Sequence, residues 1–167
     1  MVAAPTVVLD ASLPLGWALP DEGRSAPACG VLASLSVRTA LVPAHWQAEV
    51  GNGLLMALRR GRLDPGRLPQ ILAELSLLPV LVDDAGAHAA WAEPLAQTLT
   101  TGLTLYDALY LELAGRHDLP PASLDAALRH AALAAGVTVL TWRRGVVSAS
   151  QLNRAVLPPF QLRCRRS

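Results

Sequence analysis

Short runs of apolar and β-branched residues alternate along the chain with longer stretches in which apolar residues recur at helical spacing. The short runs predict strands at residues 6–10, 40–43, 79–82, 121–124 and 137–141. The fourth of these is the weakest, because Pro120 and Pro121 cannot donate the hydrogen bonds of a ladder. The longer stretches predict helices at residues 12–19, 24–38, 44–60, 65–77, 84–99, 105–117 and 125–135.

This alternation is typical of an α/β domain with a mostly parallel sheet. Local signals support several helix ends: Asp64-Pro65 has the form of an N-cap followed by proline at the first helical position, and Thr104 and Asp107 have capping-box spacing. No repeat or linker divides the first 141 residues, so we expect one domain over 1–141. The remaining stretch, 142–167, has no clear period and is rich in arginine, and we treat it as an extension of unknown role.

The distribution of charge says more about partners than its sum does. The net charge is only +1, which does not resemble a strongly basic nucleic-acid binder. All 14 basic residues are arginine, and no acidic residue follows Asp125, so the last quarter of the chain is purely basic. This asymmetry favours a polyanion or an acidic peptide as a partner.

Several classes of protein are disfavoured by motifs that the chain lacks. Charges interrupt every apolar run before it reaches membrane-spanning length, and no basic residue precedes the first run, so we expect a cytoplasmic protein with no membrane partner. The sequence has no G-x-S-x-G elbow of a serine hydrolase and no glycine-rich loop with lysine that would bind a nucleotide.

Four acidic residues lie where the predicted fold brings them toward one point. Asp10 ends the first predicted strand and Asp125 follows the fourth, and parallel α/β sheets bind ligands beyond the carboxyl ends of their strands. Glu49 lies within a predicted helix, and Asp107 lies in the first turn of another. Carboxylates gathered at low dielectric repel one another unless a cation joins them, so the pattern predicts a site for Mg²⁺ or Mn²⁺.

Two of these acids also have a purely structural interpretation. Asp107 can complete a capping box with Thr104, and Asp125 can be the N-cap of the helix that follows it. Asp10 at a strand end would also suit a phosphoacceptor domain. Such domains use a lysine to neutralise the phosphoryl group, and this chain has none, which argues against that alternative.

Five segments taken together resemble the PIN-domain ribonucleases, and in particular their VapC-type toxin branch. Each motif is weak alone, but their order and spacing over residues 6–140 are specific. The segments are Val8–Ser12, Leu41–Pro43 running into Glu49–Asn52, Arg59–Leu63, Thr104–Tyr110 and Ser123–Asp125.

The resemblance implies a PIN-like three-layer α/β/α sandwich with a mostly parallel five-stranded sheet, and cleavage of RNA with Mg²⁺ or Mn²⁺. At the positions that match the family's motifs, the resemblance implies acids that bind the metal and take part in catalysis, and polar residues that orient those acids. It also implies a homodimer bound by a cognate VapB-type antitoxin whose C-terminal segment covers the active groove. The acids are Asp10, Glu49, Asp107 and Asp125, and the polar neighbours are Ser12, Asn52 and Thr104.

Two questions stay open at this stage. One alternative is a catalytically inactive PIN-fold module that binds RNA or protein. The arginines Arg59, Arg60 and Arg62 either hold RNA phosphates or form an ordinary solvated surface. Gly51 and Gly53 each cost a helix about 1 kcal/mol relative to alanine, which predicts close packing of the helix there.

Overall fold

Four parallel strands form the sheet of this computed structural model, which describes residues 4–19, 28–31, 35, 38–86 and 91–140. The strands lie in the order β3-β2-β1-β4. They are β1 (Pro5–Leu9), β2 (Thr39–Pro43), β3 (Val80–Asp83) and β4 (Pro121–Ala122). The predicted α/β class with a parallel sheet is therefore confirmed.

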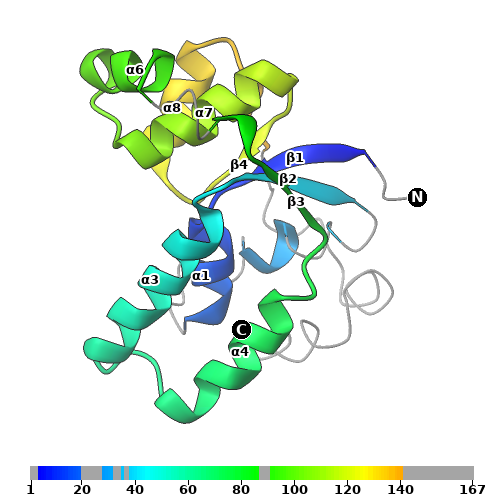
Figure 1. The fold of residues 1–167 in the computed structure, drawn as a ribbon, viewed down its shortest axis with the longest axis vertical. Helices are drawn as coiled ribbons and strands as arrows, with labels where there is room; N and C mark the ends of the chain where they lie inside the picture. The colour runs from blue at the N-terminus through cyan, green and yellow to red at the C-terminus, as the bar shows by residue number, and fades with distance from the viewer. Residues whose placement is uncertain (1–3, 20–27, 32–34, 36–37, 87–90, 141–167) are drawn as a thin grey trace.

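Helices cover both faces of the sheet (Figure 1). On one side lie α1 (Ser12–Ala18), α3 (Trp46–Arg59) and α4 (Leu68–Leu75), which follows the short 3₁₀ helix η2 (Pro65–Arg67). On the other side lie α6 (Glu93–Thr101), α7 (Leu105–His117) and α8 (Ala126–Ala134). Because α7 contacts β1, β2 and β4, it is the main cover of its face.

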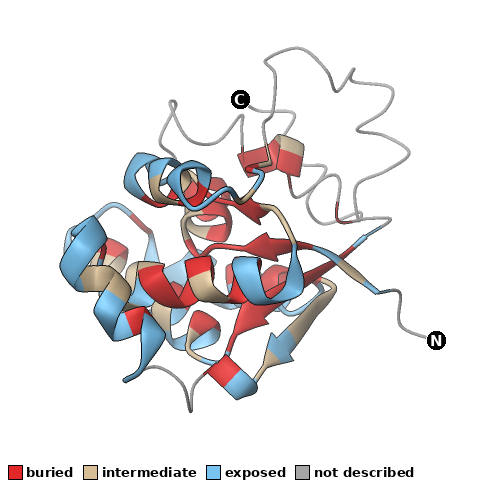
Figure 2. Cartoon of the chain, turned by 90° about the horizontal axis from the view of Figure 1, so that it is seen from above, coloured by how far each residue is buried: buried red, intermediate tan, exposed pale blue. Residues whose placement is uncertain are grey.

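The core is centred on β1, which has a neighbouring strand on each side. Val7, Val8 and Leu9 are at most 1% exposed, as expected for a parallel strand covered on both faces. Tyr110 and Leu113 of α7 pack into the same core at 0% and 1% exposure. Figure 2 shows this buried interior surrounded by exposed helix faces.

The ends of α7 and α8 follow the signals in their sequences. The hydroxyl of Thr104 accepts a 3.1 Å hydrogen bond from the backbone N–H of Asp107, so α7 begins where the capping spacing predicts. The predicted helix 105–117 matches α7 at both ends. Asp125 caps α8, whose predicted range of 125–135 is one residue longer at each end.

The predicted five-stranded sheet is wrong for the described residues, which contain four strands. Residues 137–140 run beside β4, and the N–H of Leu140 donates a 3.1 Å hydrogen bond to the carbonyl of Pro121. Pro121 has no N–H, so it cannot donate the bond to residue 138 that would continue a parallel ladder there. Residue 141, the end of the predicted strand, lies outside the described residues.

Proline also explains two differences in the helices. The predicted helix 65–77 is divided into η2 and α4, because Pro69 cannot donate to the carbonyl of Pro65 four residues earlier. Within the predicted range 84–99, residues 85 and 86 are helical and residues 87–90 lie outside the described residues. The separate helix α6 begins at Glu93, with Pro94 in its first turn.

Most of the predicted helix 24–38 and the whole extension 142–167 also lie outside the described residues. Among the helices that the structure describes, none has both the length and the apolar character needed to cross a membrane.

Candidate functional site

The strand order places one crevice at the carboxyl ends of β1 and β4. The chain proceeds outward from β1 through β2 to β3 and then returns to the other side of β1 for β4. Ligands of open α/β sheets bind at such a switch point. Asp10 directly follows β1, Ser123 directly follows β4, and the hydroxyl of Ser123 donates a 2.5 Å hydrogen bond to Oδ2 of Asp10.

Asp10 is a buried carboxylate in an acidic setting. Its side chain is 4% exposed, and Ser12 donates a second hydrogen bond to the same Oδ2. The pKa of Asp10 is raised from 3.8 to about 6: burial is the largest cause, the hydrogen bonds from the two serine hydroxyls oppose it, and the charges of Glu49 and Asp107 add to the rise. The negative charge at this point is therefore only partly balanced by the protein.

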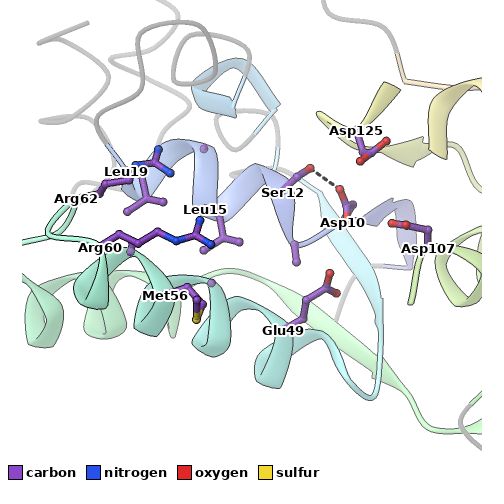
Figure 3. Close-up of a pocket in the computed structure, with 14 residues that line it drawn as sticks. Asp10, Ser12, Leu15, Leu19, Glu49, Met56, Arg60, Arg62, Asp107 and Asp125 are labelled. Carbon is purple, nitrogen blue, oxygen red and sulfur yellow. Dashed lines mark hydrogen bonds between the residues drawn. The ribbon is translucent and has the colours of Figure 1, made fainter. Parts of the chain in front are cut away.

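A cavity of about 300 Å³ opens over Asp10 between α1 and α3. Figure 3 shows the four predicted acids at one end of it, although they come from separate parts of the chain. The lining residues are Asp10, Ala11, Ser12, Leu15, Gly16, Leu19, Glu49, Gly53, Met56, Ala57, Arg60, Arg62, Asp107 and Asp125.

One stripe of α3 lines this cavity. Glu49, Gly53, Met56, Ala57 and Arg60 all border it, and their spacing of four, three, one and three residues keeps them on one helix face. A Cβ at Gly53 would lie 2.5 Å from Cδ1 of Leu15, so the predicted close packing is confirmed at Gly53, where α3 approaches α1. It is wrong at Gly51, where nothing lies within 4 Å of such a Cβ.

Glu49 is held by a tyrosine from the opposite helix layer. The hydroxyl of Tyr110 donates a 2.7 Å hydrogen bond to Oε2 of Glu49. Burial, with the charges of Asp10 and Glu49, raises the pKa of the Tyr110 phenol far above its usual range, so the hydroxyl remains a donor. Nε2 of His45 lies 3.5 Å from the same Oε2 of Glu49. The centroids of the His45 and Tyr110 rings are 5.2 Å apart.

Asp107 and Asp125 both line the cavity and serve their helices. Oδ2 of Asp107 accepts a 2.7 Å hydrogen bond from the hydroxyl of Thr104. Oδ1 of Asp125 accepts from the backbone N–H groups of Ala127 and Leu128, at 2.6 and 3.2 Å. The structural interpretation of these two acids is therefore confirmed, and it does not remove them from the site.

The four acids share one pattern of hydrogen bonds. In each carboxylate one oxygen accepts from the protein, while the other accepts no hydrogen bond from the described residues. Within this part of the chain, no three acidic, histidine or cysteine side chains form a ready-made ion site. The acids thus line one cavity from four separate parts of the chain.

The structure separates the remaining predicted residues into two groups. Ser12 lines the cavity and Thr104 bonds to Asp107, while Arg60 and Arg62 line the end of the cavity opposite the acids. Asn52 and Arg59 are exposed and do not line the cavity. At 100° per residue, Asn52 lies about 60° from Glu49, on the side away from the lining stripe.

Two residues of this site were given no role by the sequence. Ser123 bonds to Asp10, and its hydroxyl also accepts a 2.9 Å hydrogen bond from the N–H of Asp125. Tyr110 bonds to Glu49. Tyr110 lies three residues after Asp107, so the two side chains are neighbours on one face of α7. This spacing is the sequence signal that places Tyr110 near the site.

The fold is similar to that in the crystal structure of PAE2754 from Pyrobaculum aerophilum, with a TM-score of 0.54. The two chains are 23% identical, and the match covers 76% of this chain and 79% of that chain. At this identity the similarity concerns the fold alone. The sequence has no match among protein-family models or curated proteins.

Proposed function

We propose that this protein is a metal-dependent endoribonuclease with a PIN-like three-layer α/β/α fold, and the toxin component of a type II toxin-antitoxin system. The observation that carries the proposal is the convergence of four carboxylates, from β1, α3, α7 and the start of α8, on one cavity. Each presents one oxygen that the described residues leave without a hydrogen bond. A bound cation would balance the negative charge that this convergence brings together.

The donor set fits Mg²⁺ or Mn²⁺, which prefer carboxylate oxygens and retain several waters. Asp10, Glu49, Asp107 and Asp125 would hold the ion through their free oxygens. Burial, with a smaller contribution from the charges of Glu49 and Asp107, raises the pKa of Asp10, and a bound cation would favour its charged form. When bound, the ion would polarise a phosphoryl oxygen and lower the pKa of a water.

The protein's own contribution is to orient the acids. Ser12 and Ser123 hold Asp10, Tyr110 holds Glu49, and Thr104 holds Asp107. In the hydrolysis a water oxygen forms a bond to phosphorus and the bond from phosphorus to O3′ breaks. The 3′ oxygen takes a proton, so the products have a 3′-hydroxyl and a 5′-phosphate.

The decisive experiment compares the replacement of Asp10 with the replacement of a control acid, Asp64. Asp10→Asn should abolish Mg²⁺-dependent cleavage of RNA by the purified protein. Asp64→Asn should cleave normally, because Asp64 is exposed, caps η2 and does not line the cavity. Sequencing of the RNA ends checks the predicted 5′-phosphate. Equal cleavage by the Asp10→Asn protein would refute the proposal and indicate a contaminating nuclease.

The proposal includes a homodimer and a VapB-type antitoxin as partners. An exposed apolar stripe supports the homodimer: Trp91, Leu95 and Leu99 recur every four residues at 88%, 44% and 85% exposure. Apolar stripes of this kind on a soluble domain mark contact surfaces.

The antitoxin is tested by growth. Induced expression of the wild-type protein should arrest growth, whereas expression of the Asp10→Asn variant should not. Co-expression of a short neighbouring reading frame with the wild-type protein should restore growth.

A second candidate is a PIN-fold module that binds RNA or protein without cleaving. The absence of a ready-made ion site among the described residues favours it. The two candidates differ in calorimetry, because the nuclease should bind Mn²⁺ and lose that binding in Asp10→Asn. RNA binding with no uptake of Mn²⁺ and no cleavage would establish the second candidate.

A further inference from the structure

His45 is a neighbour of Glu49 that the proposed function does not use. It directly precedes α3, and its carbonyl accepts a 3.0 Å hydrogen bond from the N–H of Glu49, so the two residues lie one helical turn apart on the same face. The side chain of His45 is 18% exposed, and its Nε2 lies 3.5 Å from Oε2 of Glu49. His45 is therefore close enough to act on Glu49 and is largely shielded from solvent.

Nε2 of His45 is a buried polar atom that makes no hydrogen bond within the described part of the chain. The acceptor that it faces, Oε2 of Glu49, is about 0.5 Å beyond the usual length of an N–H···O hydrogen bond. Native structures leave few buried nitrogens without a partner. A small movement of the Glu49 side chain that shortens this distance is therefore favoured.

Two tyrosines of α7 fix the orientation of the His45 ring. The ring centroids of Tyr106 and Tyr110 both lie 5.2 Å from that of His45, Tyr106 in a tilted arrangement and Tyr110 edge-on. The hydroxyl of Tyr110 already donates to Oε2 of Glu49. Because packing holds the imidazole in place, its Nε2 stays directed at the same oxygen.

His45 faces a different cavity from the acids. Glu49 lines the acidic cavity, whereas His45 lines a second cavity, of about 330 Å³, together with Leu109 and Leu113 of α7. The described residues that line the acidic cavity do not include His45. His45 thus approaches Glu49 from outside the place where an ion would bind, which suits a residue that orients a metal ligand better than it suits a ligand.

We propose that His45 is a positioning residue for Glu49. The neutral imidazole carries its proton on Nε2 and donates it to Oε2 of Glu49. His45 and Tyr110 together then hold one carboxylate oxygen and leave Oε1 for the ion. The inference rests on the proposed metal site, and it adds a second donor to the one already described. Partners of this kind fix the direction of a metal-binding carboxylate and so set the affinity for the metal.

The test compares two amides that differ by one bond. Glutamine places its Nε2 as many bonds from Cβ as histidine does, whereas the amide nitrogen of asparagine is one bond nearer to Cβ. In calorimetry, His45→Asn should weaken Mn²⁺ binding about tenfold, and His45→Gln should restore wild-type binding. His130→Asn replaces an exposed histidine of α8 and should bind Mn²⁺ as the wild type does.

Two further measurements separate orientation of Glu49 from a general effect on the fold. Because His45 and Tyr110 act on one oxygen, the losses of Mn²⁺ affinity in His45→Asn and Tyr110→Phe should not be additive in the double variant. In the metal-free wild type, heteronuclear NMR of the labelled protein in mildly alkaline solution should find the imidazole proton of His45 on Nε2.

An imidazole protonated on Nδ1 would overturn the proposal, because the lone pair of Nε2 could not donate to Glu49. A loss in His45→Gln as large as that in His45→Asn, or additive losses in the double variant, would also overturn it. Equal Mn²⁺ affinities of His45→Asn and the wild type would do the same and leave the metal site standing. A wild type that takes up no Mn²⁺ would contradict the proposed function, and the position of the proton would then decide whether His45 orients Glu49.

Discussion

The hydroxyl of Tyr110 on α7 donates a 2.7 Å hydrogen bond to Oε2 of Glu49 on α3, so two helices on opposite sides of the sheet meet at its carboxyl edge. Tyr110 is 0% exposed, and water cannot replace its hydroxyl. The bond fixes one oxygen of Glu49 and leaves the other toward the cavity. It thereby ties the orientation of a candidate metal ligand to the packing of the core.

Replacing Tyr110 with phenylalanine should therefore affect both stability and the site. We expect the free energy of unfolding to fall by about 1.5–3 kcal/mol, the range for a hydrogen bond to a charged group. Mn²⁺ should bind more weakly, since Glu49 loses its orientation. Urea denaturation and calorimetry measure the two effects.

Tyr106→Phe is the control, because Tyr106 lies on the same helix at 57% exposure. It should change neither stability nor Mn²⁺ binding appreciably. A Tyr110→Phe protein that binds Mn²⁺ as tightly as the wild type would contradict an orienting role for this hydroxyl.

The raised pKa of Asp10 predicts a pH-dependent stability in the metal-free protein. Its folded pKa of about 6 exceeds the unfolded value of 3.8, so folding favours the protonated carboxyl. The corresponding stability is fully present below about pH 4 and is lost as the pH rises through 6, at a total cost of about 3 kcal/mol. Burial of the charged carboxylate is the main source of this cost, and the charges of Glu49 and Asp107 add to it.

Asp10→Asn should remove this dependence and be more stable than the wild type above pH 6. Urea denaturation in EDTA between pH 5 and 7.5 measures it. The opposite result would be a wild-type protein whose stability rises from pH 5 to 7.5, with no such rise in the Asp10→Asn variant. That result would show that folding stabilises the charged carboxylate of Asp10.

The two glycines in α3 predict different effects of the same substitution. Gly51→Ala should stabilise the protein by about 1 kcal/mol, because a Cβ there meets nothing within 4 Å and alanine favours the helix. Gly53→Ala should be less stable than Gly51→Ala, because its Cβ forces the terminal methyl groups of Leu15 to move and this offsets the gain in helix propensity. Thermal denaturation of the pair compares the two sites directly, and equal stabilisation by both would contradict the close approach of α1 and α3.

The exposed stripe before and along α6 predicts the effect of a charge on self-association. Leu99→Asp should shift the protein from dimer to monomer in light scattering at micromolar concentration, because an unpaired carboxylate is costly in an apolar interface. Leu133→Asp makes the same change at another exposed leucine, on α8 and outside the stripe, and should leave the dimer intact. A monomeric wild type would exclude this contact.

The parts of the fold that could be predicted depend on local signals. α7 matches its predicted range because Thr104 caps it through a bond within one turn. The fifth strand could not be predicted correctly from its apolar run, because strand pairing depends on a distant partner, and Pro121 cannot donate to it. The division of the helix at Pro69 is a local effect, because a proline five residues into a helix cannot donate the hydrogen bond that continues it.

The same distinction applies to the site. Asp10 and Asp125 were predictable because they follow strands whose carboxyl ends meet at one edge. Asn52 was expected from the family resemblance, but its side chain lies about 60° from that of Glu49, on the side of α3 away from the lining stripe, and it is exposed. Ser123 and Tyr110 act across 113 and 61 residues of sequence, respectively, and only the folded chain shows their partners.

The return of the chain to β4 has a consequence for biosynthesis. Asp10 and Glu49 emerge from the ribosome early, whereas Asp107, Ser123 and Asp125 arrive only after two thirds of the described segment has been made. A nascent or truncated chain that stops before α7 carries half of the acidic cluster and lacks the tyrosine that orients Glu49. The acidic site is therefore completed last, when nearly the whole domain has left the exit tunnel.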